Sequence, residues 1–109
     1  MSVYMYQASY SAEAIKSLID NPQDRTGAVR ALIEGNGGTL IGAWMAFGES
    51  DILVVAEMPD DESMAAVSFA VSSTGAIMNG KTTKLLTMEQ AVESMKKAQA
   101  AAKAYTPPR

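Results

Sequence analysis

One carboxylate near the middle of the chain lies in an apolar run and could therefore do acid–base chemistry. Glu57 ends the run ILVVAE, so an extended strand would place it on the same side as Leu53 and Val55. A carboxylate that is removed from water in this way can serve as a general base. An ion pair with Arg25 or Lys81, or simple exposure at the end of the strand, explains the same residue without catalysis, and we prefer that interpretation.

Three further side chains could line a pocket for a small molecule. Trp44 is the only tryptophan and could stack on an aromatic ligand. Tyr6 carries a phenol that could bind a ligand or donate a proton to it, and Met45 is the third candidate lining residue. Packing in a core or at a subunit interface is the simpler role for these side chains. The candidate ligand-binding residues are therefore Tyr6, Trp44, Met45 and Glu57, and no catalytic residue is assigned.

The composition excludes several kinds of site. The chain has no cysteine, which excludes disulfides, thiolate nucleophiles and Fe–S clusters, and no histidine, which excludes Ser-His triads and the commonest metal ligand. Asp60, Asp61 and Glu62 are adjacent carboxylates, but the capping of a following helix explains them better than a metal does. We expect neither a metal nor a cofactor. The net charge of −3 argues against a nucleic-acid partner.

The N-terminal segment has no basic region followed by an apolar one, so it does not resemble a signal peptide. No apolar run approaches the ~20 residues that a membrane-spanning helix needs. The sequence therefore predicts a cytoplasmic protein with no membrane partner.

Hydrophobic periodicity and turn residues predict the elements that position these side chains. Ser11, Asp60 and Thr87 are the expected N-caps of three helices. We expect strands at 3–10, 39–47, 52–58 and 76–86, and helices at 12–20, 22–34, 61–73 and 88–104. This order predicts an α+β ferredoxin-like sandwich, in which helices cover one face of a four-stranded antiparallel sheet. We expect a single domain over residues 1–109, with a core at about 3–95 and a tail at 105–109.

Both sides of the central hairpin strands are apolar. Simple alternation places Leu40 on the same side as Trp44, and Ile41 on the side of Met45. A chain of 109 residues has enough helices to cover only one face of the sheet. Packing of two such sheets face to face would cover the other face, so the sequence predicts a homodimer or a higher homo-oligomer built around a shared barrel.

Several short segments resemble those of a known family, the small bacterial GYD-domain proteins. The similarity covers about residues 3–95 and rests on GGTL at 37–40, GESD at 48–51, EMPDDE at 57–62 and the pair Asp24-Arg25. Ser50 stands where the family usually has tyrosine. The resemblance implies a fold of the dimeric α/β-barrel group. That group includes cofactor-free monooxygenases, haem-degrading enzymes, isomerases and ligand-sensing modules, while the family itself has no assigned activity.

These observations lead to two hypotheses about function. The preferred one is an oligomeric α/β-barrel domain that binds a small molecule or has a structural role. The alternative is a cofactor-free enzyme, similar to a monooxygenase or an isomerase, that acts on a small aromatic or apolar substrate. In either case the expected partners are further copies of the chain and a small apolar or aromatic ligand.

Overall fold

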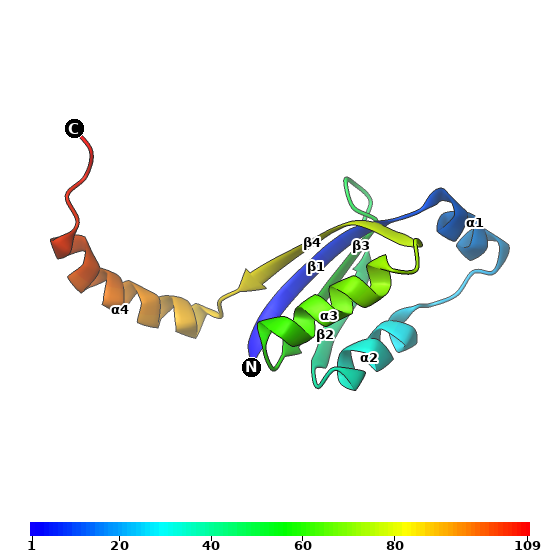
Figure 1. Ribbon diagram of the computed structural model, residues 1–109, viewed down its shortest axis with the longest axis horizontal. Helices are drawn as coiled ribbons and strands as arrows, with labels where there is room; N and C mark the ends of the chain where they lie inside the picture. The colour runs from blue at the N-terminus through cyan, green and yellow to red at the C-terminus, as the bar shows by residue number, and fades with distance from the viewer.

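The computed structural model describes residues 1–109 and contains four strands and four helices. Their order along the chain is β1 (Ser2–Tyr10), α1 (Ala12–Asp20), α2 (Thr26–Gly35), β2 (Thr39–Met45), β3 (Ile52–Met58), α3 (Asp61–Ser72), β4 (Ile77–Leu85) and α4 (Met88–Ala104). The strands form one sheet in the order β2-β3-β1-β4, and every neighbouring pair is antiparallel. Helices α2 and α3 lie over the same face of this sheet (Figure 1). The structure thus confirms the predicted ferredoxin-like α+β fold.

The core lies between the sheet and helices α2 and α3. Alternate residues of β1 and β3 point toward the helices, and Ala8 and Met58 among them are fully buried. The helices contribute Ile33 of α2 and Met64 and Val67 of α3. Burial of these side chains is the main force that holds the helices on the sheet. We call this side of the sheet the helix face, and the other side the open face.

Local capping signals fix where most helices begin. Ser11 and Asp60 accept hydrogen bonds from the backbone N–H groups of Ala14 and Ser63, and Thr87 forms a capping box with Gln90. The expected start of the second helix at residue 22 is wrong, because α2 begins at Thr26. The Asp24 carboxylate accepts the Thr26 N–H at 2.8 Å, and residues 21–25 form a loop instead.

A bulge in β2 changes the predicted alternation. Leu40 is paired with Ala56 on the helix face, and the register then shifts by one residue before Gly42 is paired with Val55 on the open face. The prediction that Leu40 shares a side with Trp44 is therefore wrong, because the extra residue reverses the alternation. The strand also ends at Met45 rather than at Phe47, whose side chain is fully exposed in the hairpin loop.

A second bulge lies in β4, next to its glycine. The register with β1 shifts where Asn79 and Gly80 oppose the segment between Gln7 and Ser9, and Asn79 has a φ of 56°. A Cβ atom at Gly80 would collide with the hydroxyl of Tyr6. Only glycine leaves room for the Tyr6 ring at this position.

Helix α4 lies apart from the rest of the chain (Figure 1). Only Leu86 and Thr87 separate it from β4, and it extends the molecule to 59 Å along its longest axis. Met88, Val92 and Met95 lie three to four residues apart on this helix and are exposed. The helix thus carries an apolar stripe that no other element of the chain covers. No helix of the chain is both long and apolar enough to cross a membrane.

Candidate functional site

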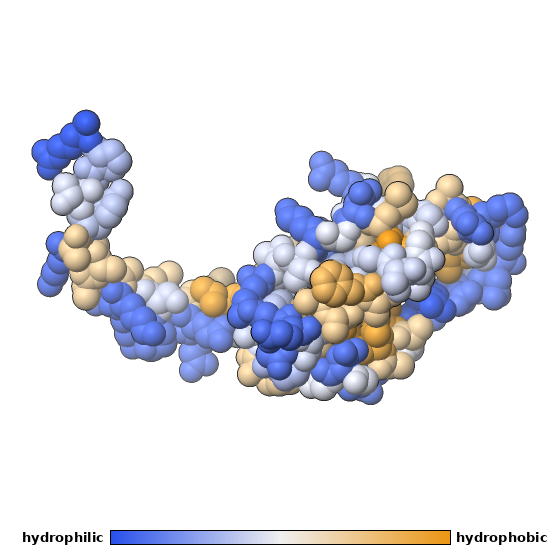
Figure 2. Space-filling model, in the orientation of Figure 1, coloured by the Kyte–Doolittle hydropathy of each residue, from blue (hydrophilic) through white to orange (hydrophobic).

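A pocket of about 460 Å³ lies between the helix face of the sheet and helices α1, α2 and α3. Sixteen of its twenty lining residues are hydrophobic. Figure 2 shows apolar surface in the region between α3 and α2. The sheet contributes Tyr6, Val54 and Ala56 to the lining, and the helices contribute Leu18, Leu32 and Val67. These side chains come from five elements, so only the folded chain creates the pocket.

Tyr6 lies in this lining and has an unusual hydroxyl. The side chain is only 6% exposed, and its hydroxyl is the one buried side-chain polar atom in the chain without a hydrogen-bond partner. The ring is held against the bulge at Gly80. A buried hydroxyl without a partner costs stability. We infer that the packing of the Tyr6 ring outweighs the cost of leaving its hydroxyl unpaired.

Arg25 and Tyr10 are two of the polar residues of the pocket, whose lining also includes Ser17, Gln23 and Thr74. Arg25 lies in the loop before α2, where its Nη1 donates a hydrogen bond to Gln23 Oε1 at 3.0 Å. Burial raises the pKa of Tyr10, the positive charge of Arg25 opposes this rise, and the Asp51 carboxylate adds to it. Tyr10 therefore stays protonated at neutral pH and can donate a hydrogen bond.

Asp51 ties the hairpin loop to β1. An Asp in a turn commonly caps the turn by binding its own backbone. Instead its Oδ2 accepts the backbone N–H of Tyr10 at 2.9 Å, and its own N–H donates to the carbonyl of Ala8. These two bonds tie the hairpin to the end of β1, next to the pocket.

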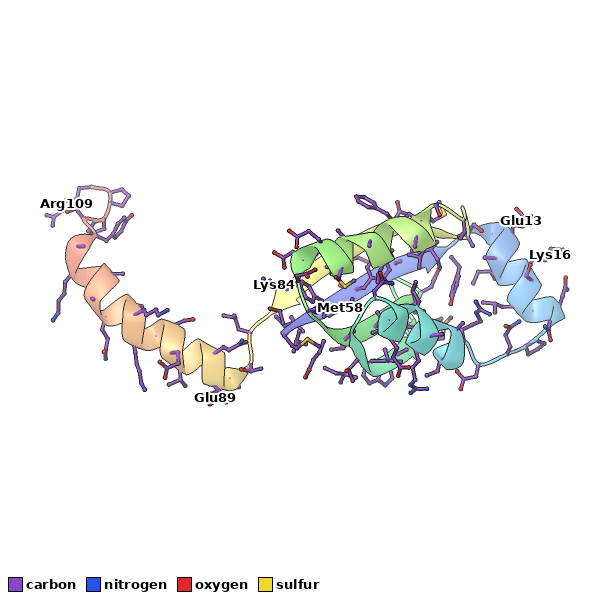
Figure 3. All side chains as sticks on the ribbon, turned by 60° about the horizontal axis from the view of Figure 1, so that its bottom comes forward. Glu13, Lys16, Met58, Lys84, Glu89 and Arg109 are labelled. Atoms are coloured by element: carbon purple, nitrogen blue, oxygen red, sulfur yellow. The ribbon has the colours of Figure 1, made fainter.

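A polar cluster at the start of α3 is the second feature on the helix face. Asp61 accepts hydrogen bonds from the hydroxyl of Tyr4 and, at 3.0 Å, from the Nζ of Lys84 on β4. Figure 3 shows Lys84 beside the first turn of α3. The bond to Asp61 raises the pKa of Tyr4 and of Lys84, while Tyr4 and then Lys84 lower the pKa of Asp61.

The cluster therefore holds a neutral phenol, a carboxylate and an ammonium group at neutral pH. None of the three can exchange a proton readily under these conditions. The arrangement instead ties the N-terminus of α3 to the edge strand β4. The sequence identifies Asp60 correctly as the helix cap, but it does not reveal that Asp61 binds residues 57 and 23 positions away.

The four candidate residues from the sequence do not form one site. Tyr6 lines the pocket, and Met45 and Trp44 line an adjoining hollow of about 590 Å³ at the edge of β2. The Trp44 ring lies over Gly42, on the open face. Glu57 is also on the open face, where it lies between Val3 of β1 and Thr39 of β2.

Glu57 forms no ion pair with Arg25 or Lys81, so this one of the two explanations without catalysis is wrong. The chain has three ion pairs, Lys16–Asp20, Lys84–Asp61 and Lys96–Glu93, and none includes Glu57. Arg25 lines the pocket beneath the helices, whereas Glu57 lies on the other side of the sheet. Glu57 is half-buried on the open face, beside Val3 and Thr39.

Two residues of the pocket were missed by reasoning from the sequence. The sequence suggests Arg25 only as a possible partner for Glu57 and as part of the pair Asp24-Arg25. Tyr10 shares a strand face and a phenol with Tyr6, but it is not among the four candidate residues. The alternation of side chains along β1 could have indicated Tyr10, because it places Tyr10 on the same face of the strand as Tyr6. No group of three or more Asp or Glu residues in the chain could hold a metal ion.

Comparison with known proteins gives a family and a similar structure. The family model of the GYD domain matches residues 4–104. Among solved structures, the crystal structure of FFRP-DM1 is similar, with a TM-score of 0.49 and 14% sequence identity over 79% of this chain and 100% of that chain. No curated protein matches the sequence.

Proposed function

The chain belongs to the GYD domain family, and we propose that it acts as a homo-oligomeric domain that binds a small apolar molecule. The observation that carries this proposal is the pocket of about 460 Å³ between the sheet and the helices. Pockets for small molecules commonly measure about 300–1,000 Å³ and have mostly apolar walls with a few polar groups. The pocket here has both properties.

Binding fits the pocket better than catalysis does. Its twenty lining residues include no Asp, Glu or Lys, and the chain has no His or Cys. A guanidinium has no acceptor atom, and the Tyr10 phenol has a raised pKa, so neither side chain offers a base at neutral pH. Glu57, the base that the enzyme hypothesis requires, lies on the opposite face of the sheet.

A neutral fluorescent probe tests the binding function. N-phenyl-1-naphthylamine is apolar and uncharged, and we expect its emission to rise on binding, with displacement by octan-1-ol. Ala28→Phe should weaken the binding about tenfold, because Ala28 lines the pocket and the larger ring would occupy part of it. Ala31→Phe, an exposed position on the same helix outside the lining, is the matched control. Equal probe affinity in the two variants would contradict the assignment of the pocket.

The open face of the sheet supports the proposal that the domain is a homo-oligomer. Its central part consists of Val3, Met5, Leu53 and Val55, and no helix lies over it. With strands ~4.8 Å apart and a rise of ~3.3 Å per residue, a four-stranded face measures roughly 440 Å² in projection. A second copy of the chain fits this surface, because an identical apolar face can cover it symmetrically.

Helix α4 adds to the surface that a second copy would cover. It lies away from the body of the chain in two views (Figures 1 and 3). Its 17 residues span about 26 Å. With a width of ~10 Å, helix and sheet face together offer roughly 700 Å², close to the ~800 Å² per partner that stable interfaces bury. We therefore propose that a second copy of the chain binds both the open face and helix α4.

Light scattering tests the oligomer independently of the ligand. We expect the parent protein to have at least the mass of a dimer at micromolar concentration, and Val55→Lys to shift it toward the monomer by placing a charge in the centre of the interface. Ala66→Lys adds the same charge to an exposed position on α3 and should leave the mass unchanged. A monomeric parent protein would refute the homo-oligomer.

A further inference from the structure

The pocket contains a single charged residue, and this residue has no partner of opposite charge. Arg25 is the only ionisable group among the twenty lining residues apart from the phenols of Tyr6 and Tyr10. None of the three ion pairs of the chain includes Arg25. A positive charge beside a mainly apolar pocket, with no carboxylate in the lining, favours a ligand that supplies the negative charge.

The loop before α2 holds the guanidinium in place. Arg25 Nη1 donates to Gln23 Oε1 at 3.0 Å, and Gln23 Nε2 in turn donates to the carbonyl of Asn21 at 3.2 Å. The neighbouring Asp24 is occupied as the acceptor of the Thr26 N–H. A guanidinium has five N–H donors, so most of those of Arg25 remain free after the bond to Gln23.

Arg25 also lies where the two hollows of this region meet. It lines both the pocket and the adjoining hollow at the edge of β2, and Tyr10 does the same. The two residues therefore share the lining of both hollows, and the positive charge of Arg25 opposes the rise in the pKa of Tyr10. A ligand head group at this point would meet a guanidinium and a protonated phenol, with the Asp24 carboxylate also in the lining of the adjoining hollow. The body of the ligand would lie among the mainly apolar side chains of the pocket.

From this arrangement we propose that the ligand is an apolar carboxylic acid, whose carboxylate binds Arg25 and Tyr10 and whose hydrocarbon part fills the pocket. The planar guanidinium can bind both oxygens of a carboxylate with two parallel hydrogen bonds. The Tyr10 hydroxyl supplies a third donor. This inference rests on the proposed function, because it names the chemical class of the molecule that the pocket binds.

Titration calorimetry with three ligands of equal chain length tests the inference. Octanoate, octan-1-ol and octylamine differ only in the head group, and we expect octanoate to bind about tenfold more tightly than octan-1-ol, and octylamine least tightly. Arg25→Gln should abolish the preference for octanoate, so that octanoate and octan-1-ol bind this variant with about equal affinity. Arg30→Gln removes an equal charge from α2 outside the lining and should keep the preference.

The possible outcomes separate this inference from the proposed function. Equal affinity of the parent protein for octanoate and octan-1-ol would overturn the carboxylate assignment and leave an apolar binding pocket. A preference that survives in Arg25→Gln would overturn the role of Arg25. Failure of all three ligands, and of the neutral naphthylamine probe, would overturn both proposals. The ratio of the affinities for octanoate and octan-1-ol in the parent protein tests the carboxylate assignment even if Arg25→Gln does not fold.

Discussion

Tyr4 and Tyr6 offer a direct test of how this core is built, because the same substitution should have opposite effects at the two positions. They lie two residues apart on the helix face of β1 and are 3% and 6% exposed. The Tyr4 hydroxyl donates to the Asp61 carboxylate, whereas the Tyr6 hydroxyl has no partner. Phenylalanine at either position removes only the hydroxyl.

The expected size of the Tyr6→Phe effect follows from the cost of a buried polar group. A buried hydroxyl without a partner costs ~1–3 kcal/mol of stability, so removing it should relieve this cost. The small void that the missing oxygen leaves offsets part of the gain. We expect Tyr6→Phe to increase the free energy of unfolding by about 1 kcal/mol, which corresponds to a rise in Tm of about 4 °C. Tyr4→Phe should lower Tm, because it removes a hydrogen bond to a charged group.

Urea unfolding followed by far-UV circular dichroism at one protein concentration measures both changes. Tyr105→Phe, in the exposed C-terminal segment, is the control and should leave the midpoint unchanged. A loss of stability of about 1 kcal/mol or more in Tyr6→Phe would show that the hydroxyl has a partner in solution, and the interpretation of Tyr6 would then be wrong.

Two further predictions concern the residues around these tyrosines. The hydrogen bonds from Tyr4 and Lys84 lower the pKa of Asp61 in the folded chain below its ordinary value of 3.8. The Asp61 carboxylate therefore stabilises the fold above pH 3.8, and this stabilisation is lost as the pH falls through the folded pKa. Asp61→Asn should therefore be less stable than the parent protein at pH 7, and the difference between their urea midpoints should narrow toward pH 3. A difference that stays constant with pH would contradict the stabilising role of the Asp61 carboxylate. Gly80→Ala should lower the free energy of unfolding by about 2 kcal/mol, because the added Cβ collides with the Tyr6 ring and hydroxyl. Thermal unfolding measures this loss, and part of it should be recovered in Gly80→Ala combined with Tyr6→Phe; an unchanged Tm in the single variant would refute the contact.

The sequence predicts the fold well, because its signals are local. Ser11, Asp60 and Thr87 bind backbone N–H groups within three residues, so each helix start can be recognised from a short segment. The glycine of β4 likewise indicates its bulge. The bulge in β2 was missed, because the register shift at Gly42 depends on pairing with β3 and not on the local alternation.

The site was harder to predict, because its contacts join distant parts of the chain. The bond from Tyr4 to Asp61 spans 57 positions, and no local pattern indicates it. Glu57 was chosen for its apolar neighbours in sequence, but the pairing of β3 with β1 places it on the open face with Val3. Arg25 reaches the pocket only because residues 21–25 form a loop where the sequence predicts a helix.

A methyl-resolved NMR titration with octanoate tests the central claim, the binding pocket beneath the helices, most directly. Val54 and Val67 line the pocket, whereas Val3 and Val55 lie on the open face of the same sheet. The proposed function predicts saturable shifts of the methyl signals of Val54 and Val67, with little change at Val3 and Val55. Shifts confined to Val3 and Val55, or no saturable shift at any valine, would contradict it.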